Sequence, residues 1–121
     1  MISRSNKYKN KKVILEGIKF DSIKESKRYI ELKLLHDARQ IAHLELQPKF
    51  LLQPNFEHKY QGKQRDITYI ADFSYYIPED GDEFAQRVVE DVKSPATKTD
   101  VYRVKRKMFL SLFPDVDHRE V

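Results

Sequence analysis

Hydrophobic and polar residues follow strand-like patterns in the middle of this chain. Residues 69–77 and 88–93 are rich in aromatic and β-branched side chains, a composition that is typical of β-strands. Between them, residues 78–82 contain Pro78, three acids and Gly81, which favours a turn. We therefore expect an antiparallel hairpin formed by strands at about residues 66–77 and 84–93.

Two other segments place their apolar residues at helical spacing. The first begins at Ser22, runs to about residue 40 and carries one apolar stripe, made of Ile23, Ile30, Leu34, Ala38 and Ile41. The second runs from near Thr99 to Phe113, where Pro114 ends it. Its predicted apolar face consists of Val101, Val104, Met108 and Leu112.

The remaining segments predict shorter strands. Residues 13–20 are expected to form a hairpin that turns at Glu16 and Gly17. Further strands are expected at residues 43–47, 49–53, 56–60 and 116–121. The core order is then helix, three strands, helix, strand, and the second helix can return the last strand to the central sheet. We predict a single α/β domain over residues 1–121, with a mixed central sheet flanked by helices, an extra N-terminal hairpin and a flexible basic arm at residues 1–10.

Composition excludes several classes of protein. The chain of 121 residues has no cysteine, which excludes disulfides and zinc–thiolate sites and suits a reducing, cytoplasmic compartment. No apolar run approaches 18 residues, so we expect no membrane span, and the polar N-terminus shows no secretory signal. The three glycines are too scattered for a glycine-rich phosphate loop, and we expect no nucleotide cofactor.

The positive charge is concentrated in two regions of a chain whose net charge is +4. Residues 1–12 contain no acid, and their cations are Arg4, Lys7, Lys9, Lys11 and Lys12. Residues 98–107 contain one acid against five cations: Lys98, Arg103, Lys105, Arg106 and Lys107. Such clusters favour a polyanionic partner, most commonly nucleic acid, although a basic surface without a partner has the same pattern.

Three charged residues gather in the predicted central hairpin. Asp72 lies in its first strand, and Asp91 and Lys93 lie in its second. Because side chains alternate along a strand, Asp91 and Lys93 share a face and Val92 points away. Charges in a sheet are costly unless they are paired or bind an ion. Two carboxylates and the Val92 carbonyl are suitable Mg²⁺ ligands for phosphodiester hydrolysis, with Lys93 orienting the water or holding a phosphate oxygen.

Other interpretations of these residues stay open at this level. The same three side chains would also suit a solvent-facing salt-bridge ladder. A shift of one residue in the second strand would turn Glu90 inward in place of Asp91. Glu25 suits a capping box with Ser22, yet on a helical wheel it falls with Tyr29, Leu32 and His36, on a face that could look toward Asp72. The four histidines show no paired metal-ligand spacing and are expected to be structural.

Four segments taken in order resemble a known family. Residues 17–29, 69–73, 89–93 and 97–102 are similar to a small endonuclease family of bacteriophages and prophages, within the PD-(D/E)XK nuclease superfamily. The resemblance covers roughly residues 7–121. It implies the restriction-endonuclease-like αβββαβ fold and Mg²⁺-dependent cleavage of DNA, with Mn²⁺ as a substitute, in the cytoplasm of a bacterial host.

The resemblance also assigns roles by position. Glu25 matches the acid of the first helix, Asp72 the aspartate of the second core strand, and Asp91 and Lys93 the acid-x-Lys pair. Lys105 matches a polar position on the following helix. Ala71 stands where the superfamily has proline, and an aspartate at position 91 is shorter than the more frequent glutamate, so the choice between Asp91 and Glu90 as metal ligand stays open.

Small members of this superfamily include Holliday-junction resolvases, which act as two-fold dimers. A short chain with a basic arm suits such a role, because symmetric cutting of two strands requires a C2 dimer. We expect DNA contacts from Lys7, Lys9, Lys11, Lys12, Lys98, Arg103 and Lys105. The alternatives are a basic nucleic-acid-binding module without catalysis, and a nuclease that acts in DNA packaging or beside a transposase-like partner.

Overall fold

A computed structural model describes residues 12–121, and the predicted arm at residues 1–10 lies outside them. The predicted N-terminal hairpin is confirmed: β1 (Val13–Leu15) pairs with β2 (Ile18–Phe20) in antiparallel fashion. The two turn residues, Glu16 and Gly17, have φ angles of 53° and 78°. Two successive residues with positive φ are characteristic of the two-residue turn whose twist matches a hairpin.

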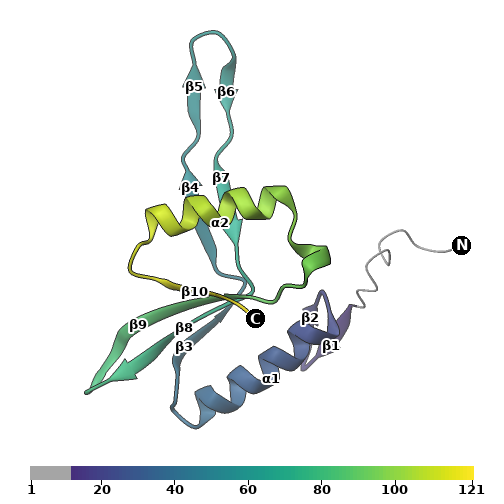
Figure 1. Cartoon of the computed structure of the whole chain (residues 1–121), viewed down its shortest axis with the longest axis vertical. Coiled ribbons are helices and arrows are strands. Elements are labelled where there is room, and N and C mark those ends of the chain that lie inside the picture. The colour runs from purple at the N-terminus through teal and green to yellow at the C-terminus, as the bar shows by residue number, and fades with distance from the viewer. Residues whose placement is uncertain (1–11) are drawn as a thin grey trace, which may run out of the picture.

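A four-stranded mixed sheet forms the centre of the molecule (Figure 1). Its spatial order is β10 (Asp117–Glu120), β9 (Asp82–Asp91), β8 (Phe73–Glu79) and β3 (Ala42–Leu46). β9 is antiparallel to β8, which is antiparallel to β3, whereas β10 runs parallel to β9. The predicted return of the last strand to the central sheet is therefore confirmed.

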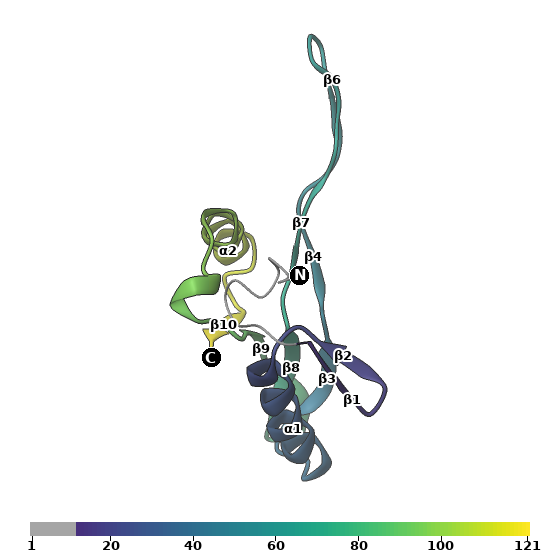
Figure 2. The same ribbon diagram turned by 90° about the vertical axis from the view of Figure 1, so that its right-hand side faces the viewer.

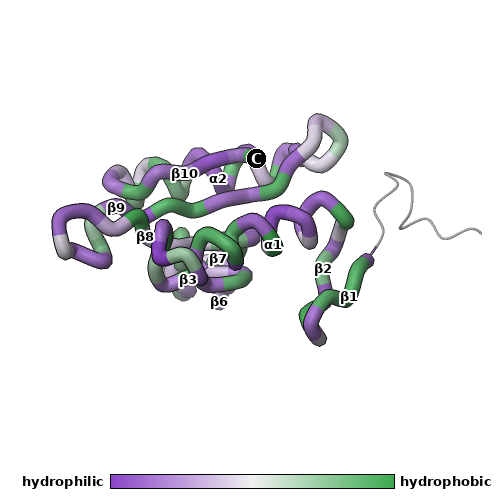
Figure 3. The backbone as a smooth tube through the Cα atoms, turned by 90° about the horizontal axis from the view of Figure 1, so that it is seen from below, coloured by the Kyte–Doolittle hydropathy of each residue, from purple (hydrophilic) through white to green (hydrophobic). Residues whose placement is uncertain are grey.

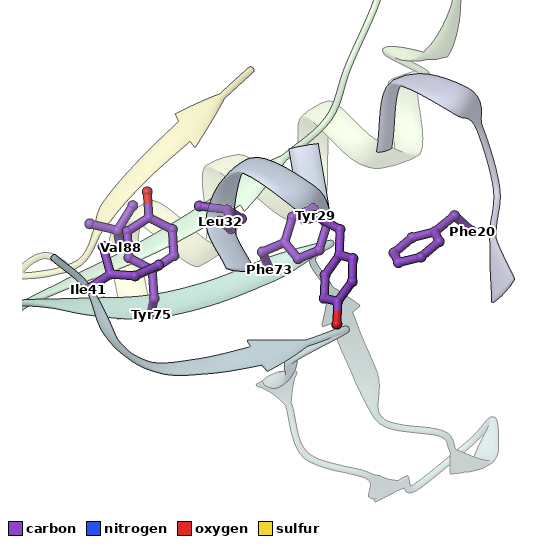
Figure 4. Close-up of a cluster of buried hydrophobic side chains, with 7 residues drawn as sticks. All are labelled: Phe20, Tyr29, Leu32, Ile41, Phe73, Tyr75 and Val88. Atoms are coloured by element: carbon purple, nitrogen blue, oxygen red, sulfur yellow. The ribbon is translucent and has the colours of Figure 1, made fainter. Parts of the chain in front are cut away.

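One helix covers each face of this sheet. Val88 packs in a cluster with Tyr29 and Leu32 of α1 (Ile23–Asp37), which Figure 4 shows. Its neighbour Val89 packs in a second cluster with Phe109 of α2 (Asp100–Leu112). Because adjacent strand residues point to opposite faces, the two helices lie on opposite sides of β9. Mixed α/β architecture is thus as predicted.

The predicted apolar faces of both helices are wrong at most positions, although Met108 packs against the core cluster that contains Phe109. Ile23, Ile30 and Leu34 on α1 are 46%, 46% and 65% exposed, and Ile41 is buried but lies beyond the helix. On α2, Val101 and Val104 are 65% and 59% exposed. Hydrophobic positions are interspersed with hydrophilic ones along both helices (Figure 3).

Aromatic side chains explain which helix faces turn inward. The buried face of α1 carries Tyr29, whose ring centre lies 5.1 Å from that of Phe20. The buried face of α2 carries Tyr102 and Phe109. An aromatic side chain buries more apolar area than an aliphatic one and gains from contacts with other rings. The number of apolar residues on a face therefore did not indicate which face of each helix is buried.

The predicted strand at residues 66–77 is divided in two. β7 (Ile67–Ile70) pairs with β4 (Lys49–Gln53) in a separate sheet, and the chain bends before β8. The segment between β3 and β4 also bends, opposite Asp72, at Gln47, whose φ is 51°. Beyond β4 and β7, β5 (Phe56–His58) and β6 (Gly62–Gln64) extend the hairpin into a long protrusion (Figures 1 and 2). Strand β6 was not predicted.

A short connection leads from β9 into α2. It contains one turn of 3₁₀ helix, η2 (Pro95–Thr97). Helix α2 then starts at Thr99, whose hydroxyl accepts the N–H of Tyr102 at 3.1 Å, as the predicted start requires. This connection passes the ends of β8 and β9, where the candidate site lies.

Candidate functional site

Asp72 lies at the bend between β7 and β8. Its backbone N–H donates to the carbonyl of Glu90 at 3.1 Å, and its carbonyl accepts the N–H of Gln47 at 2.9 Å. Its carboxylate Oδ2 accepts the N–H of Val92 at 2.7 Å. Burial raises the pKa of Asp72, while the Val92 N–H and the charge of Lys93 oppose that rise. The bend thus presents a partly desolvated carboxylate at the end of β9.

Glu25 approaches Asp72 from the first turn of α1. The Ser22 hydroxyl accepts the N–H of Glu25 at 3.1 Å, which is the first half of the predicted capping box. The residue is 5% exposed. Burial, together with the negative charges of Asp72 and Asp21, raises the pKa of Glu25 to about 7. The backbone N–H of Glu25 therefore donates to the Ser22 cap, while its carboxyl group faces Asp72.

Lys93 brings a positive charge to the same place. Its charge lowers the pKa of both Glu25 and Asp72, against the effect of burial. Its ammonium nitrogen lies 4.3 Å from the ring centre of Tyr102, a distance typical of a cation–π contact. The Lys93 carbonyl accepts a 2.8 Å hydrogen bond from the ammonium of Lys24, which joins α1 to the end of β9.

These side chains line a cavity of about 250 Å³ between the start of α1 and the end of β9. Its lining is polar and consists of Asp21, Ser22, Lys24, Glu25, Asp72, Val92, Lys93, Ser94 and Thr97. A second cavity of about 260 Å³ shares Glu25 and Asp72 with the first. The two carboxylates therefore face open space on two sides.

Asp91 and Glu90 lie on opposite faces of the sheet, and neither lines these cavities. Asp91 is on the α2 side with its Oδ2 3.2 Å from Nε2 of His118, and its charge raises the pKa of Tyr102. Since Lys93 also contacts Tyr102, the predicted shared face of Asp91 and Lys93 is confirmed. The expected convergence of Asp91 with Asp72 in one cavity is not observed.

Glu90 is occupied by a buried ion pair on the α1 side. Arg28 donates from Nε to Oε1 at 2.7 Å and from Nη2 to Oε2 at 2.6 Å. The hydroxyl of Tyr75 also donates to Oε2. Such a two-bonded Arg–carboxylate pair is strong and geometrically specific. Glu90 is thus a structural partner of Arg28 in this arrangement.

The family model that matches the chain supplies a further observation. The family described as "Protein of unknown function (DUF1064)" matches residues 5–121. This chain belongs to the DUF1064 family. No curated protein and no solved structure matches the chain.

Two further residues of this DUF1064 protein were not predicted, one in the cavity and one beside Asp91. Asp21 lines the cavity beside Glu25, and the acidic residue just before a helix cap was the available indication. His118 has a fully buried side chain, and its Nδ1 accepts the Nε–H of Arg106 at 3.2 Å. Nε2 therefore carries the proton and points at Asp91 and at the Tyr69 hydroxyl. Only the pairing of β10 with β9 reveals that contact.

The donor set of the DUF1064 cavity fits a hard divalent cation. Glu25 and Asp72 offer carboxylate oxygens, and the charge of Asp72 raises the pKa of Glu25, a repulsion that a cation would relieve. Within residues 12–121, no group of three or more histidine or acidic side chains is arranged to hold a metal. Mg²⁺ binds through one or two carboxylates and keeps several waters, so the pair suits it.

The predicted DNA-binding cations of the DUF1064 chain are spread over the surface. Lys98 lies 3.3 Å from Glu120, and Lys105 lines a separate groove with Val101 and Ile67. Arg103 and Lys12 are exposed. Lys7, Lys9 and Lys11 lie outside the described residues. In the described part of the chain, no helix is long and apolar enough to span a membrane.

Proposed function

We propose that this chain is a Mg²⁺-dependent DNA endonuclease that hydrolyses phosphodiester bonds in branched DNA, as Holliday-junction resolvases do in recombination. The observation that carries the proposal is one cavity lined by Glu25, Asp72 and Lys93. Two carboxylates and a lysine are the groups that Mg²⁺-assisted phosphodiester hydrolysis requires. These three residues come from three separate parts of the chain, whereas a simple surface ion pair needs only two.

The topology supports a restriction-endonuclease-like core. Around the central sheet the elements follow the order α1, β3, β8, β9, α2, β10, which is the helix–three strands–helix–strand order of that core. The first three strands are antiparallel neighbours, and the last is parallel to β9. In this assignment Asp72 precedes the second core strand, and Asp91 and Lys93 stand at the end of the third.

Each residue then has a chemical role. Glu25, Asp72 and the Val92 carbonyl would hold the metal. When bound, the ion activates a water and neutralises charge on the phosphate. The ammonium group of Lys93 binds a phosphate oxygen or orients the water. The pKa of Glu25 is near 7. When the Glu25 carboxylate is ionised, it accepts a hydrogen bond from that water.

We assign Asp91 rather than Glu90 to the acid-x-Lys pair. Glu90 has both oxygens engaged by Arg28, whereas Asp91 is on the same face as Lys93. Nε2 of His118 lies 3.2 Å from Oδ2 of Asp91. A ligand held by a second side chain keeps its orientation, as is common around metal sites. Because Asp91 lies outside the cavity, it would reach the metal only if its carboxylate turned away from His118.

A dimer of two identical chains would allow the two opposed strands of a junction to be cut. Each cavity serves one strand, and an isologous contact places two such cavities in a symmetric arrangement. The exposed stripe of Ile23, Ile30 and Leu34 runs along the 15-residue helix α1. Two copies of this stripe pair with each other in antiparallel orientation, so the second copy of the chain covers it.

Cleavage of a labelled four-way junction, beside matched linear duplex and single strand, tests the proposal. We expect paired nicks on the junction with Mg²⁺ and none with EDTA. Asp72→Asn removes a charge from the cavity and should lower the rate at least about 100-fold, on the scale of a lost electrostatic contribution to catalysis. Asp80→Asn, in the exposed turn between β8 and β9, is the matched control and should cut at the wild-type rate.

Other results separate the alternatives. Cutting of duplex alone would keep the endonuclease and discard the resolvase. If Asp72→Asn cuts at the wild-type rate, the cavity is not the active site. DNA binding without cutting of any substrate, with or without Mg²⁺, would favour the non-catalytic binding module.

A further inference from the structure

The protruding hairpin is the part of the molecule that the proposed active site does not use. Strands β5 and β6 form a two-stranded sheet of their own, separate from the central sheet. Figures 1 and 2 show that it points away from both helices. From Pro54 to Tyr60 the chain extends roughly 20 Å, at about 3.3 Å per residue. We call residues 54–66 the finger.

The tip of the finger is organised by its own side chains. Nδ1 of His58 accepts the N–H groups of Tyr60 and Gln61 at 3.1 and 3.0 Å. Gly62 has a φ of 76°, which a glycine adopts without strain. The amide of Gln64 donates to the carbonyl of Gln61 at 3.2 Å. These hydrogen bonds fix the backbone of the turn, so the side chains of the turn point outward in one defined arrangement.

Two aromatic residues of the finger face solvent. Tyr60 at the tip is 78% exposed and Phe56 is 46% exposed. An isolated two-stranded hairpin is only marginally stable in water, and exposed rings add nothing to its folding. Aromatic rings that face solvent on a projecting element are available to stack on the flat rings of a ligand. The finger thus has the features of a recognition element.

Its charge indicates the class of ligand. The finger contains Lys59, Lys63 and Arg65, and its two acids, Glu57 and Asp66, flank the part of it at residues 58–65 that contains these cations. The ammonium of Lys59 lies 5.3 Å from the ring centre of Tyr60. Cations beside an exposed aromatic ring suit a ligand that has phosphates and flat rings, which is nucleic acid. A two-stranded ribbon also fits the DNA major groove, which is about 12 Å wide.

We propose that the finger enters branched DNA, where Tyr60 stacks on an unpaired base and Lys59, Lys63 and Arg65 contact the neighbouring phosphates. Branched DNA as the ligand rests on the proposed function, but the finger itself holds none of the cavity residues. Bases at a branch point are less constrained than in a duplex, so a ring can stack on them without breaking a pair. The finger would therefore favour junctions over linear DNA.

The experiment measures DNA binding by the full chain in EDTA, so that cutting plays no part. The probe is a four-way junction with 2-aminopurine at the branch point, beside a linear duplex of the same sequence. Tyr60→Ala removes the stacking on one base, so this variant should bind the junction about 10-fold more weakly than the wild type. The fluorescence change at the branch point should also disappear. Tyr60→Phe keeps the ring and should restore both.

Two controls sharpen the result. Phe84→Ala removes an exposed ring from the other hairpin, β8–β9, and should bind as wild type does. Replacing Lys59, Lys63 and Arg65 together by alanine should reduce the slope of log K against log salt by about 2 to 3, since each lost phosphate contact changes it by about 0.9.

The outcomes also distinguish the finger from the endonuclease. Asp80→Asn, outside both the finger and the cavity, should bind the junction with wild-type affinity and give the full fluorescence change. If the finger binds but nothing is ever cut, the finger stands and the endonuclease fails. If junctions are cut while Tyr60→Ala binds and stacks as wild type does, only the finger proposal is overturned. If Tyr60→Ala instead abolishes self-association and leaves DNA binding intact, the finger contacts a second copy of the chain and the DNA role is refuted.

Discussion

Replacement of Glu25 by glutamine should stabilise the metal-free protein at high pH. Burial and the charges of Asp72 and Asp21 raise the pKa of Glu25 from 4.5 in the unfolded chain to about 7. The folded state therefore binds this proton more tightly than the unfolded state does. The resulting stabilisation is fully present below pH 4.5 and is lost as the pH rises through about 7.

The magnitude follows from the difference between the two pKa values. Each pKa unit corresponds to about 1.4 kcal/mol, so ionising Glu25 in the folded protein costs up to about 3 kcal/mol. Glu25→Gln keeps the shape of the side chain and removes that charge. At pH 8 we expect the variant to exceed the wild type in free energy of unfolding by about 2 to 3 kcal/mol. At pH 4.5 the two should be about equal.

Urea unfolding in EDTA at several pH values between 4.5 and 8 measures this difference. The comparison between the two proteins cancels the titration of groups that Glu25 does not contact. Glu31→Gln is the matched control, because Glu31 is on the same helix but is mostly exposed and pairs with Arg28. Its effect should stay below about 0.5 kcal/mol. A difference between wild type and Glu25→Gln that is constant across the pH range would refute this account of the cavity.

Two more variants address the remaining assignments. Glu90→Gln should lower the free energy of unfolding, measured in urea, by about 3 kcal/mol, because it leaves the Arg28 guanidinium without its buried counter-charge. The folded variant should retain the proposed endonuclease activity, and retention of full stability would contradict the role of the ion pair. If the proposed dimer forms through α1, Leu34→Glu should convert it to a monomer in light scattering after gel filtration, whereas Leu112→Glu, on the exposed side of α2, should not. A persistent Leu34→Glu dimer would place the interface elsewhere.

Local sequence patterns predicted the elements whose ends are set by local chemistry. The turn at Glu16 and Gly17, the cap at Ser22 and the start of α2 at Thr99 each depend on a few neighbouring residues. Hydrogen bonds between side chain and nearby backbone determine such boundaries. These contacts are the same in a short segment and in the folded domain, which is why the sequence alone was sufficient.

Local sequence patterns did not predict the features that depend on contacts between distant segments of the chain. The apolar stripe of Leu34 met the rule for helical spacing, but α1 turned Tyr29 inward because Phe20 and Phe73 were there to receive it. The bend at Asp72 needs Gln47 and Glu90 as hydrogen-bond partners. Both partners are more than fifteen residues away in the chain, so no local pattern contains them.

The bend at Asp72 and the inward face of α1 are two sides of one structural solution. If the strand ran straight through residue 72, the Asp72 carboxylate would project from one face of the sheet. The bend instead places this carboxylate where it accepts the N–H of Val92. The same inward rotation of α1 that buries Tyr29 brings Glu25, one helical turn earlier, to within electrostatic reach of that carboxylate. The features that sequence patterns missed are therefore the ones that assemble the cavity, and the cost of holding Glu25 there is the quantity that Glu25→Gln measures.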